Sequence, residues 1–313
     1  MVLTVTLNPS VDKTYILDSF KPEELNRANK VLLNAGSKGI NVSRVCGLLG
    51  RDTLALGLIG GNTGELLIKK LNEEGVNFDP VRIKNFETRL NVKVMDLSAK
   101  AITGINETGE PISSDDYSLF IEKYQEKLPF ADIVVLSGSL LPDMVLGTYF
   151  NLIKIAKQYK KDVFLDCGGS VLRESIKASP FCIKPNLFEF EDMLGKTGLS
   201  EQQILKESMA LIEKYDIERI VVTLGKNGVI GVTKDEAIKV IPPAVAVNST
   251  VGAGDAFLAG MCHGHLSNIE FSRQLVLGTS CASAKVTKEG NNIPSMIELL
   301  GYTDGCRIES LNI

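Results

Sequence analysis

The chain is poor in the residue that most often carries out acid–base chemistry. Its 313 residues include only two histidines, His263 and His265, so a histidine-based relay would have to use one of them. This scarcity favours carboxylate chemistry. The six cysteines form no CxxC pair and no export signal is visible, so we expect reduced core thiols. The run from Cys262 to His265 lies in a predicted helix where neighbouring side chains face apart, which disfavours a metal site there.

Long apolar runs and dense positive charge are also absent. No stretch approaches the roughly 18 apolar residues of a membrane span, and MVLTVTLNPSVDK at the N-terminus lacks the basic region of a signal peptide. The net charge is −4, and no cluster of Lys and Arg indicates nucleic-acid binding. We therefore expect a cytoplasmic protein that binds neither nucleic acid nor membranes.

Two familiar phosphate-binding motifs are missing as well. GxxxxGKS or GxxxxGKT does not occur, and GAGDAF lacks the third glycine of the dinucleotide fingerprint. Residues 248–260 instead read NSTVGAGDAFLAG, in which a glycine-rich turn and an aspartate precede an apolar run of small residues. Gly252 and Gly254 let backbone N–H groups approach an anion closely, and the following helix adds partial positive charge. With Asp255 as a base, this is the chemistry of phosphoryl transfer to an alcohol, although an ordinary capped helix start has the same pattern.

Apolar runs bounded by turn residues alternate with helix-like segments along the chain. The predicted strands are 2–7, 54–60, 132–138, 162–167, 181–186 and 219–225, and the predicted helices are 39–50, 63–75, 113–128 and 200–216. The strands are rich in Val, Ile and Leu without polar alternation, which is typical of parallel strands buried on both faces. This order predicts an α/β fold with a doubly wound, mostly parallel sheet. We expect Gly50 and Gly75 to follow two helix ends, and Ser113 and Ser200 to cap two helix starts.

Two segments, 12–34 and 87–106, alternate polar and apolar residues, and the second has a hairpin pattern. They predict a small sheet beside the core, with one face covered by substrate or by a second subunit. No linker or repeat is visible, so we expect one catalytic unit over residues 1–313. Its core would comprise about 1–11, 35–86 and 107–313, and its lid about 12–34 and 87–106.

Small, polar or charged residues follow nearly every predicted strand. These are NPSVD, SGSLLP, Asp166, KPNLFE and TLGKNG, and a further glycine-rich loop, NAGSKGIN at 34–41, precedes the first helix. Ligands of open α/β sheets bind at the carboxyl ends of the strands, and these residues suit sugar hydroxyls and phosphates. We interpret Asp166 as structural as readily as functional.

With these motifs, the chain resembles the PfkB-type, ribokinase-like carbohydrate kinases. TLNPSVD, AGSKGINVSR, TRLNVK, SGSLLP, KPN..E, TLGKNG and STVGAGD occur in the order and rough spacing of that family, from Leu3 to about Asn292. Within it, the chain is most similar to the branch of 1-phosphofructokinase and tagatose-6-phosphate kinase. The resemblance implies a three-layer αβα core with a small β-sheet lid, and phosphorylation of a sugar hydroxyl with ATP and Mg²⁺. It also implies a homodimer formed through the lid.

The resemblance assigns roles to individual residues. Asp255 corresponds to the catalytic base, and Gly252, Ala253 and Gly254 would donate N–H groups to the transferring phosphate. The substrate-binding residues would be Asp12, Lys38, Gly39, Asn41, Arg89, Lys93, Arg27 and Ser139. Among these, Asp12 and Asn41 would offer paired oxygen acceptors to a polyol, and Lys38, Arg89 and Lys93 would hold the phosphate already on the substrate. Arg27, expected in a lid strand, would join them from its own subunit or across a dimer.

On the nucleotide side, Asn186 and Glu189 match an NxxE motif that would organise Mg²⁺ through water. The other nucleotide-binding residues would be Lys184, Thr223, Gly225, Gly228, Ser280, Ser283 and Asn291. One departure from the family pattern is Ser37, where the lysine loop usually has glycine. Because serine disfavours a positive φ, we expect a slightly different turn, with the hydroxyl offering a hydrogen bond to substrate.

We expect the substrate to be a ketohexose monophosphate, most readily fructose 1-phosphate, because TRLNVK and INETGEPIS (105–113) look more like 1-phosphofructokinase. Tagatose 6-phosphate is the alternative. A nucleoside or free-sugar kinase fits less well, because a neutral substrate has no need of three cations. An inactive sugar-phosphate-binding regulator would not require Asp255 and its glycine turn.

Overall fold

The predicted apolar runs lie at the centre of a ten-stranded sheet with the order β14-β13-β12-β11-β10-β9-β8-β1-β4-β5. This computed structural model describes residues 1–288 and 292–312. The strands of this sheet are β1 (Val2–Thr6), β4 (Thr53–Ile59), β5 (Val81–Arg82), β8 (Ile133–Ser137), β9 (Asp162–Asp166), β10 (Cys182–Ile183), β11 (Arg219–Thr223), β12 (Val229–Val232), β13 (Ala237–Ile241) and β14 (Arg307–Leu311).

Seven strands, from β11 to β5 in the sheet order, are parallel, which confirms the predicted fold class. The last three strands, β12, β13 and β14, add an antiparallel edge that the sequence pattern did not indicate. The connection from β11 to β12 is only the short turn at Gly225–Asn227, and a turn of this length joins antiparallel strands.

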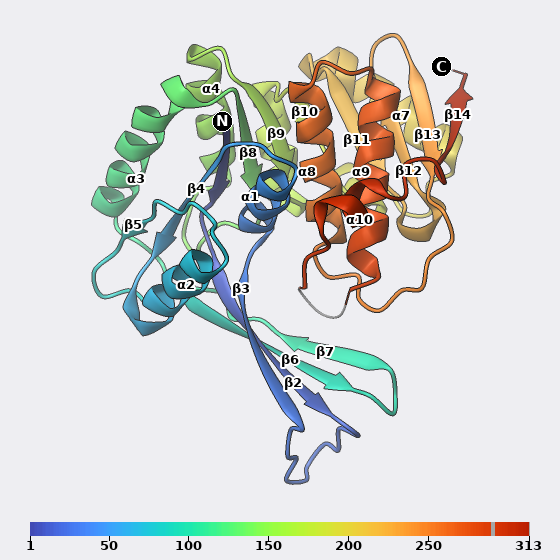
Figure 1. Ribbon diagram of the computed structural model, residues 1–313. Helices are drawn as coiled ribbons and strands as arrows, with labels where there is room; N and C mark the ends of the chain where they lie inside the picture. Colours follow the sequence, from blue (N-terminus) through green and yellow to red (C-terminus); the bar gives the residue numbers. More distant parts are fainter. Residues whose placement is uncertain (289–291, 313) are drawn as a thin grey trace.

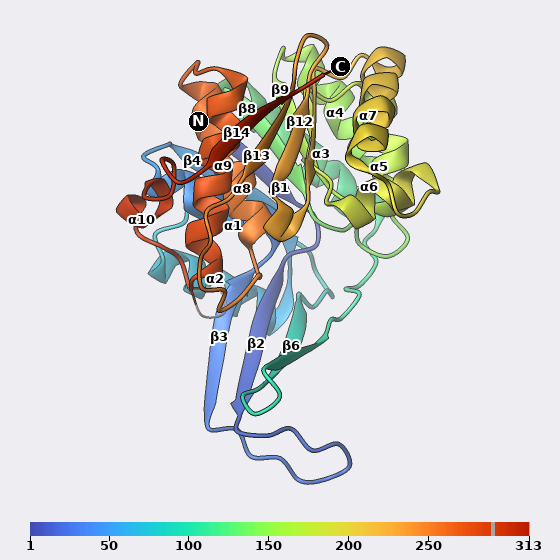
Figure 2. The same ribbon diagram turned by 90° about the vertical axis from the view of Figure 1, so that its right-hand side faces the viewer.

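Helices cover both faces of the sheet (Figures 1 and 2). One face carries α1 (Lys38–Leu48), α8 (Ala253–Leu266), α9 (Phe271–Val286) and α10 (Met296–Leu300). The other carries α3 (Ser114–Lys127), α4 (Thr148–Gln158), α5 (Gly169–Ser175), α6 (Leu187–Leu194) and α7 (Glu201–Tyr215). Short 3₁₀ turns lie at Leu128–Phe130, Ile176–Ala178 and Gly225–Asn227. None of the described helices is long and apolar enough to cross a membrane.

Burial on both faces explains why the central strands lack polar alternation. In β1, Val2 packs into the cluster beneath α1, α8 and α9, whereas Leu3 and Val5 pack into the cluster on the opposite face. Successive side chains of a strand point to opposite faces, so a strand between two apolar cores carries apolar residues toward both faces, and the buried Thr4 of β1 pairs its hydroxyl with that of Ser43.

The predicted helix ends are confirmed. Ser113 and Ser200 each accept a hydrogen bond from the third residue of their helix, and both form complete capping boxes. Gly50 and Gly75 lie just beyond the ends of α1 and of α2 (Gly61–Glu73), with φ of 81° and 69°.

A second sheet projects from one end of the core in Figure 1, and we call it the lid. Its strand order is β3-β2-β6-β7, built from β2 (Ser10–Leu17), β3 (Lys30–Gly36), β6 (Arg89–Asp96) and β7 (Ala101–Ile105). Helix α2 packs against the base of the lid through an apolar cluster that includes Val11, Ala35, Ile40 and Leu67. The chain enters the lid directly from β1 and returns from β3 into α1, so both crossings lie beside the carboxyl end of β1.

Candidate active site

A polar cavity of about 680 Å³ lies between the lid and the carboxyl ends of the core strands. It brings together most of the predicted residues from every part of the chain. Those that line it are Asp12, Lys38, Asn41, Arg89, Lys93, Ser139, Lys184, Asn186, Glu189, Thr223, Gly225, Gly252, Gly254 and Asp255.

The lid contributes one row of polar side chains from β2 and one from β6. These strands pair in parallel with Ser10 opposite Arg89, Asp12 opposite Asn91 and Thr14 opposite Lys93. Asp12 accepts hydrogen bonds from Asn91 Nδ2 at 3.0 Å and from Lys93 Nζ at 2.6 Å. The carboxylate is therefore held in a fixed orientation at the cavity wall, and much of the charge of Lys93 is balanced by it.

Arg89 differs from the other cations of the cavity. It donates Nε and Nη2 to the carbonyl oxygen of Asn8 at 3.2 and 2.9 Å, and Nη1 to the carbonyl oxygen of Glu107 at 3.2 Å. No carboxylate of the described residues lies within 4.0 Å of its guanidinium, so neutral acceptors hold a positive charge at the cavity wall. Burial lowers the pKa of Arg89 from its usual value.

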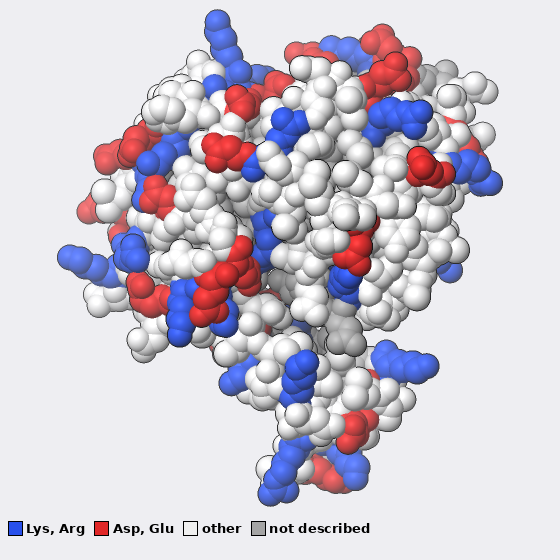
Figure 3. Space-filling view, viewed as in Figure 1, with Lys and Arg blue, Asp and Glu red and all other residues white. Residues whose placement is uncertain are grey.

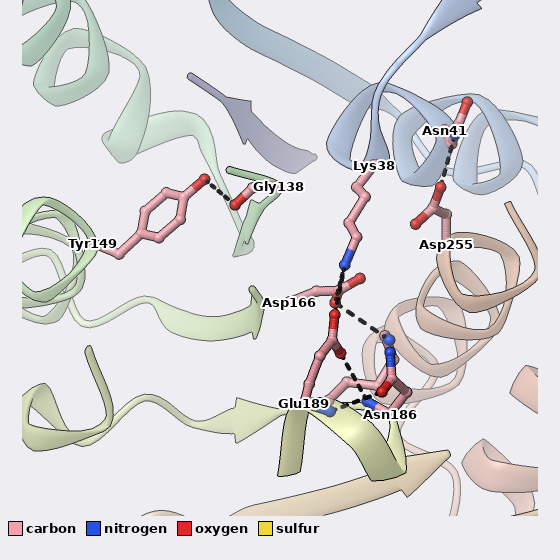
Figure 4. Close-up of polar contacts among 9 residues, drawn as sticks. Lys38, Asn41, Gly138, Tyr149, Asp166, Asn186, Glu189 and Asp255 are labelled. Atoms are coloured by element: carbon pink, nitrogen blue, oxygen red, sulfur yellow. Dashed lines mark hydrogen bonds and ion pairs between the residues drawn. The ribbon is translucent and has the colours of Figure 1, made fainter. Parts of the chain in front are cut away.

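A cluster of two lysines and two carboxylates forms the floor of the cavity (Figure 4). Lys38 Nζ lies 3.1 Å from Asp166 Oδ1 and 3.5 Å from Glu189 Oε1, and Lys184 Nζ lies 3.4 Å from the same Asp166 oxygen. Asp166 is fully buried, which alone would raise its pKa, but the two ammonium groups outweigh this and lower it. The pKa of Lys38 is raised by Asp166 and Glu189 despite burial.

Asp255 lies in the first turn of α8, almost fully buried, opposite the lid. Its Oδ2 accepts a hydrogen bond of 2.7 Å from Asn41 Nδ2 (Figure 4). Burial is the largest cause of its pKa, which is raised to about 6, and the charge of Asp166 adds to the effect. The hydrogen bond from Asn41 and the charges of Lys38 and Lys184 act in the opposite direction. A carboxylate with this pKa is ionised at neutral pH and still basic enough to take a proton from a hydroxyl.

The glycine turn before Asp255 separates the polar cavity from an apolar cavity of about 650 Å³. Gly252 has a φ of 77° and caps α8, and Gly254 lines both cavities. The N–H groups at the start of a helix lack intrahelical acceptors, so those of Gly252 and Gly254 remain available to an anion. The N–H of Ala253 differs from our expectation, because it donates to the carbonyl oxygen of Thr250 at 3.3 Å.

The walls of the apolar cavity come from the loop before the turn, from α8 and from α9. Val245, Val247, Phe257 and Val286 line it, and the predicted residues Thr223, Gly225, Gly228 and Ser283 lie at its edge. A flat aromatic group with a charged tail fits such a site, because the base would lie between apolar walls and the tail at the helix start.

Ser37 adopts the positive φ that serine was expected to disfavour. Its φ and ψ are 114° and 146°, a region that residues other than glycine rarely occupy. The residue sits between the end of β3 and the start of α1, where the chain must turn sharply to bring Lys38 into the cavity. The buried Ser37 hydroxyl has no hydrogen-bond partner among the described residues.

Several predicted residues lie elsewhere or act differently. Arg27 is exposed in the loop between β2 and β3 rather than in a strand, and it does not line the cavity. Gly39 faces β1, where a side chain would collide with Thr6. Ser280 faces α10, donating to the carbonyl oxygen of Leu299 at 2.7 Å and accepting from the N–H of Tyr302. Asn291 lies outside the described residues.

The expected pairing of oxygen acceptors from Asp12 and Asn41 is also wrong. The side-chain oxygen of Asn41 accepts from Arg44 at 2.6 Å, and its amide N–H group faces Asp255 instead. The side-chain oxygen of Asn41 is therefore not available to a substrate hydroxyl beside Asp12. Asn8, Ser10, Asn91 and Asn106 line the cavity and were missed from the sequence. For Asn91 a signal existed, because it lies two residues from both Arg89 and Lys93 in an alternating strand.

The residues present fit a divalent cation beside the nucleotide phosphates. Asp166 Oδ2 is buried without a hydrogen-bond partner among the described residues, and Glu189 lies within reach of the same lysine. Asn186 and Glu189 bond each other's backbone N–H in a capping box, so their oxygens are already engaged, which suits Mg²⁺ contact through water. Figure 3 shows acidic and basic side chains interspersed over one face of the molecule.

The αβα core, the lid and the paired cavities at the strand ends define a ribokinase-like protein. A family model described as pfkB family carbohydrate kinase matches residues 5–298, and the chain belongs to this family. It is a sugar kinase, which is a phosphotransferase.

Solved structures of full-length relatives agree with this assignment. Phosphofructokinase-2 from Escherichia coli is 28% identical with a TM-score of 0.91, covering 97% of this chain and 98% of its own. A structure from Thermotoga maritima named as a possible 1-phosphofructokinase is 27% identical with a TM-score of 0.90, covering 99% of both chains.

Proposed function

We propose that this kinase transfers the γ-phosphate of ATP to a hydroxyl of a ketohexose monophosphate and forms a bisphosphate. The observation that supports it most directly is Arg89, a guanidinium held at the cavity wall by carbonyl oxygens rather than by a carboxylate. A dianionic phosphate on the substrate would supply the counter-charge, and the fork of Arg suits its oxygens. Lys93 would add a second cation on the same face of the lid.

In this proposal Asp255 acts as the base for the attacking hydroxyl. Its Oδ2 is occupied by Asn41, so Oδ1 would receive the proton. The free N–H groups at Gly252 and Gly254 would stabilise the charge that develops on the transferring phosphate. Lys38 and Lys184 would screen the phosphate oxygens from Asp166 and Glu189. Mg²⁺, held through water near Asp166 and Glu189, would neutralise charge on the nucleotide phosphates.

Fructose 1-phosphate is the substrate we favour, and tagatose 6-phosphate is the alternative. The similarity to a possible 1-phosphofructokinase supports the first, but the chain is just as similar to a phosphofructokinase solved with fructose 6-phosphate. All three substrates carry a phosphate at one end and a primary hydroxyl at the other. We expect the reaction in the cytoplasm, since the six cysteines are free thiols suited to a reducing compartment.

ADP release with a panel of sugars tests this function. With ATP and Mg²⁺, we expect turnover with fructose 1-phosphate at the highest kcat/KM, and little or none with free fructose or a nucleoside. Arg89→Gln should raise KM for the sugar phosphate about tenfold or more with a smaller change in kcat, because the lost contact exists before and during the reaction. Absence of ADP release with every phosphorylated ketohexose would refute the proposal.

We also propose that the chain forms a homodimer through the lid. The two edge strands of the lid expose large apolar side chains, Val31 and Leu33 on β3 and Ile102 and Ile105 on β7, which are 38–62% exposed. A free sheet edge with such residues is a natural pairing surface. Light scattering after gel filtration should give twice the 34.0 kDa of the chain, and Ile105→Lys should give the monomer mass. A monomer in the wild type would contradict this proposal.

A further inference from the structure

Arg44 is a buried charged residue to which no role has yet been given. It lies on α1, one turn after Asn41, and is only 6% exposed. Its guanidinium donates Nε to Glu74 Oε2 at 2.8 Å, Nη1 to Asn41 Oδ1 at 2.6 Å and Nη2 to the carbonyl oxygen of Ala35 at 3.2 Å. Nη2 also pairs with Glu74. One side chain thus joins the end of α2, the end of lid strand β3 and the residue that contacts Asp255.

These contacts determine which way the amide of Asn41 points. A guanidinium has five donors and no acceptor, so only the oxygen of the Asn41 amide can face Arg44. The NH₂ group of the same amide must then face Asp255, where it donates to Oδ2 at 2.7 Å. Without Arg44 the amide could rotate by half a turn and present its oxygen to a protonated Asp255, whose O–H would donate to it.

We propose that Arg44 is a positioning residue for the base: it holds the Asn41 amide so that Asp255 always receives a donor on Oδ2 and accepts the substrate proton on Oδ1. This inference rests on the proposed role of Asp255. The guanidinium is itself fixed by Glu74 and by the Ala35 carbonyl, so the base is oriented from outside the cavity. Since Ala35 precedes the turn at Ser37, the same contact links the lid strand to the orientation of the base.

Several charged groups around Asp255 affect its pKa, and the effect of removing Arg44 has to be separated from theirs. Lys38 and Lys184 lower the pKa of Asp255, Asp166 raises it, and the buried Lys285 of α9 interacts with Asp255 electrostatically. Of these groups, only Lys285 also interacts with Arg44, whose charge lowers the pKa of Lys285. Loss of Arg44 would therefore favour a charged Lys285, which opposes the rise in the pKa of Asp255 expected here. The contribution of Asn41 is a hydrogen bond that lowers the pKa of Asp255, and it exists only in the amide orientation that Arg44 enforces. A rotated amide would favour the protonated acid, which can donate to the amide oxygen.

Arg44→Met tests this inference, because methionine keeps most of the apolar stem and removes every donor. In the wild type kcat/KM should fall as pH drops through about 6, the pKa of Asp255. This fall in kcat/KM on the acid side is the acid limb of the pH profile. In the variant we expect the midpoint of the acid limb to move up by about one pH unit or more. Activity should then drop about fivefold or more at pH 6 and much less at pH 9, where Asp255 is ionised in either case.

The matched control is Arg51→Met, which removes an arginine that follows α1 and contacts α8. Arg51 donates to His263 and Ser267 near the far end of α8, away from Asp255. Its loss should leave the acid limb in place. A loss of activity in Arg44→Met that is equal at all pH values, or no shift of the limb, would overturn the inference.

A double-variant cycle separates the proposed route from a general structural effect. If Arg44 acts through the amide, Arg44→Met should cause no further shift of the limb in an Asn41→Ala background; additive shifts would overturn the inference.

Should Arg44→Met fail to fold, Glu74→Gln keeps Arg44 but loosens its hold, and a smaller upward shift is expected. The pKa of Asp255 can also be followed by ¹³C NMR of labelled carboxylates without substrate. Should the wild type lack kinase activity, the proposed function would fail while this titration still decides the role of Arg44.

Discussion

Asp255→Asn should lower kcat by about a thousandfold, because it removes the group proposed to take the proton of the attacking hydroxyl. Asparagine has nearly the same shape, so ATP binding in the apolar cavity should change little. The measurement is ADP release at saturating fructose 1-phosphate, with nucleotide affinity measured separately by calorimetry. Retained turnover would contradict the assignment of Asp255 as the base.

The same substitution should raise the stability of the protein at neutral pH. The pKa of Asp255 is raised from 3.8 to about 6, so its extra stabilisation is present below pH 4 and lost as pH rises through about 6. Above that pH the buried carboxylate lowers the free energy of unfolding by about 3 kcal/mol relative to a neutral residue. Asparagine carries no such cost, and urea unfolding at pH 7.5 should show the gain, which shrinks below pH 4.

The exposed Asp304 provides the control for charge alone, because Asp304→Asn changes the net charge by the same amount. It should alter neither kcat nor the pH dependence of unfolding. Loss of activity together with gain of stability is the expected pattern for a strained functional residue, whereas a structural aspartate would show loss of both.

The features of the fold that the sequence predicts are those set by local patterns. The strand positions follow from apolar runs, since β1 must satisfy two cores at once. The helix starts at Ser113 and Ser200 follow from a capping pattern three residues long. The antiparallel edge from β12 to β14 was missed because its short strands carry no pattern that distinguishes edge from centre.

The site is less predictable where the outcome depends on helix phase. Thr279, Ala282, Ser283 and Val286 line the apolar cavity at the spacing of one helical face, while Ser280 points to α10. Because α9 has small residues on all sides, its sequence does not show which face meets the apolar cavity. Arg27 was placed in a strand although Pro22 marks a break in the pattern nearby.

Some side-chain contacts near the site could be predicted from the sequence, and others could not. Asn41 and Arg44 are three residues apart on a helix, so a hydrogen bond between their side chains was foreseeable. That Glu74 would hold Arg44 was not, because this pairing depends on how α2 packs beside α1. The pairing of Lys93 with Asp12, which are 81 residues apart, likewise depends on the register between β2 and β6, and no local pattern fixes it.

Asp166→Asn should destabilise the protein by about 3–5 kcal/mol at neutral pH, because it leaves the buried ammonium group of Lys184 and the partly exposed one of Lys38 without their shared counter-ion. Lys184 is only 4% exposed and cannot turn to water, and Lys38 keeps only its weaker contact with Glu189. The pKa of Asp166 is lowered from 3.8, so its contribution is present above that pH and lost as pH falls through the lowered value. The free energies of unfolding in urea of the wild type and of Asp166→Asn should therefore differ by the full amount at pH 7 and become equal in acid.

Asp216→Asn is the matched control, because Asp216 also pairs with a lysine, Lys234, at 2.9 Å, but both side chains are more than half exposed. Breaking this surface pair should cost less than about 1 kcal/mol. Equal effects of the two substitutions would show that the buried cluster contributes no more than a surface contact.

A second substitution can separate the structural and catalytic parts of this cluster. Removing a buried charge together with its partner is often nearly neutral, whereas removing one alone is not. Lys184→Met added to Asp166→Asn should therefore recover part of the lost stability, since one uncompensated ammonium disappears. It should not recover turnover, because Lys184 lies beside Gly254, where the transferring phosphate is proposed to bind. Recovery of both would mean that the cluster only holds the floor of the cavity together.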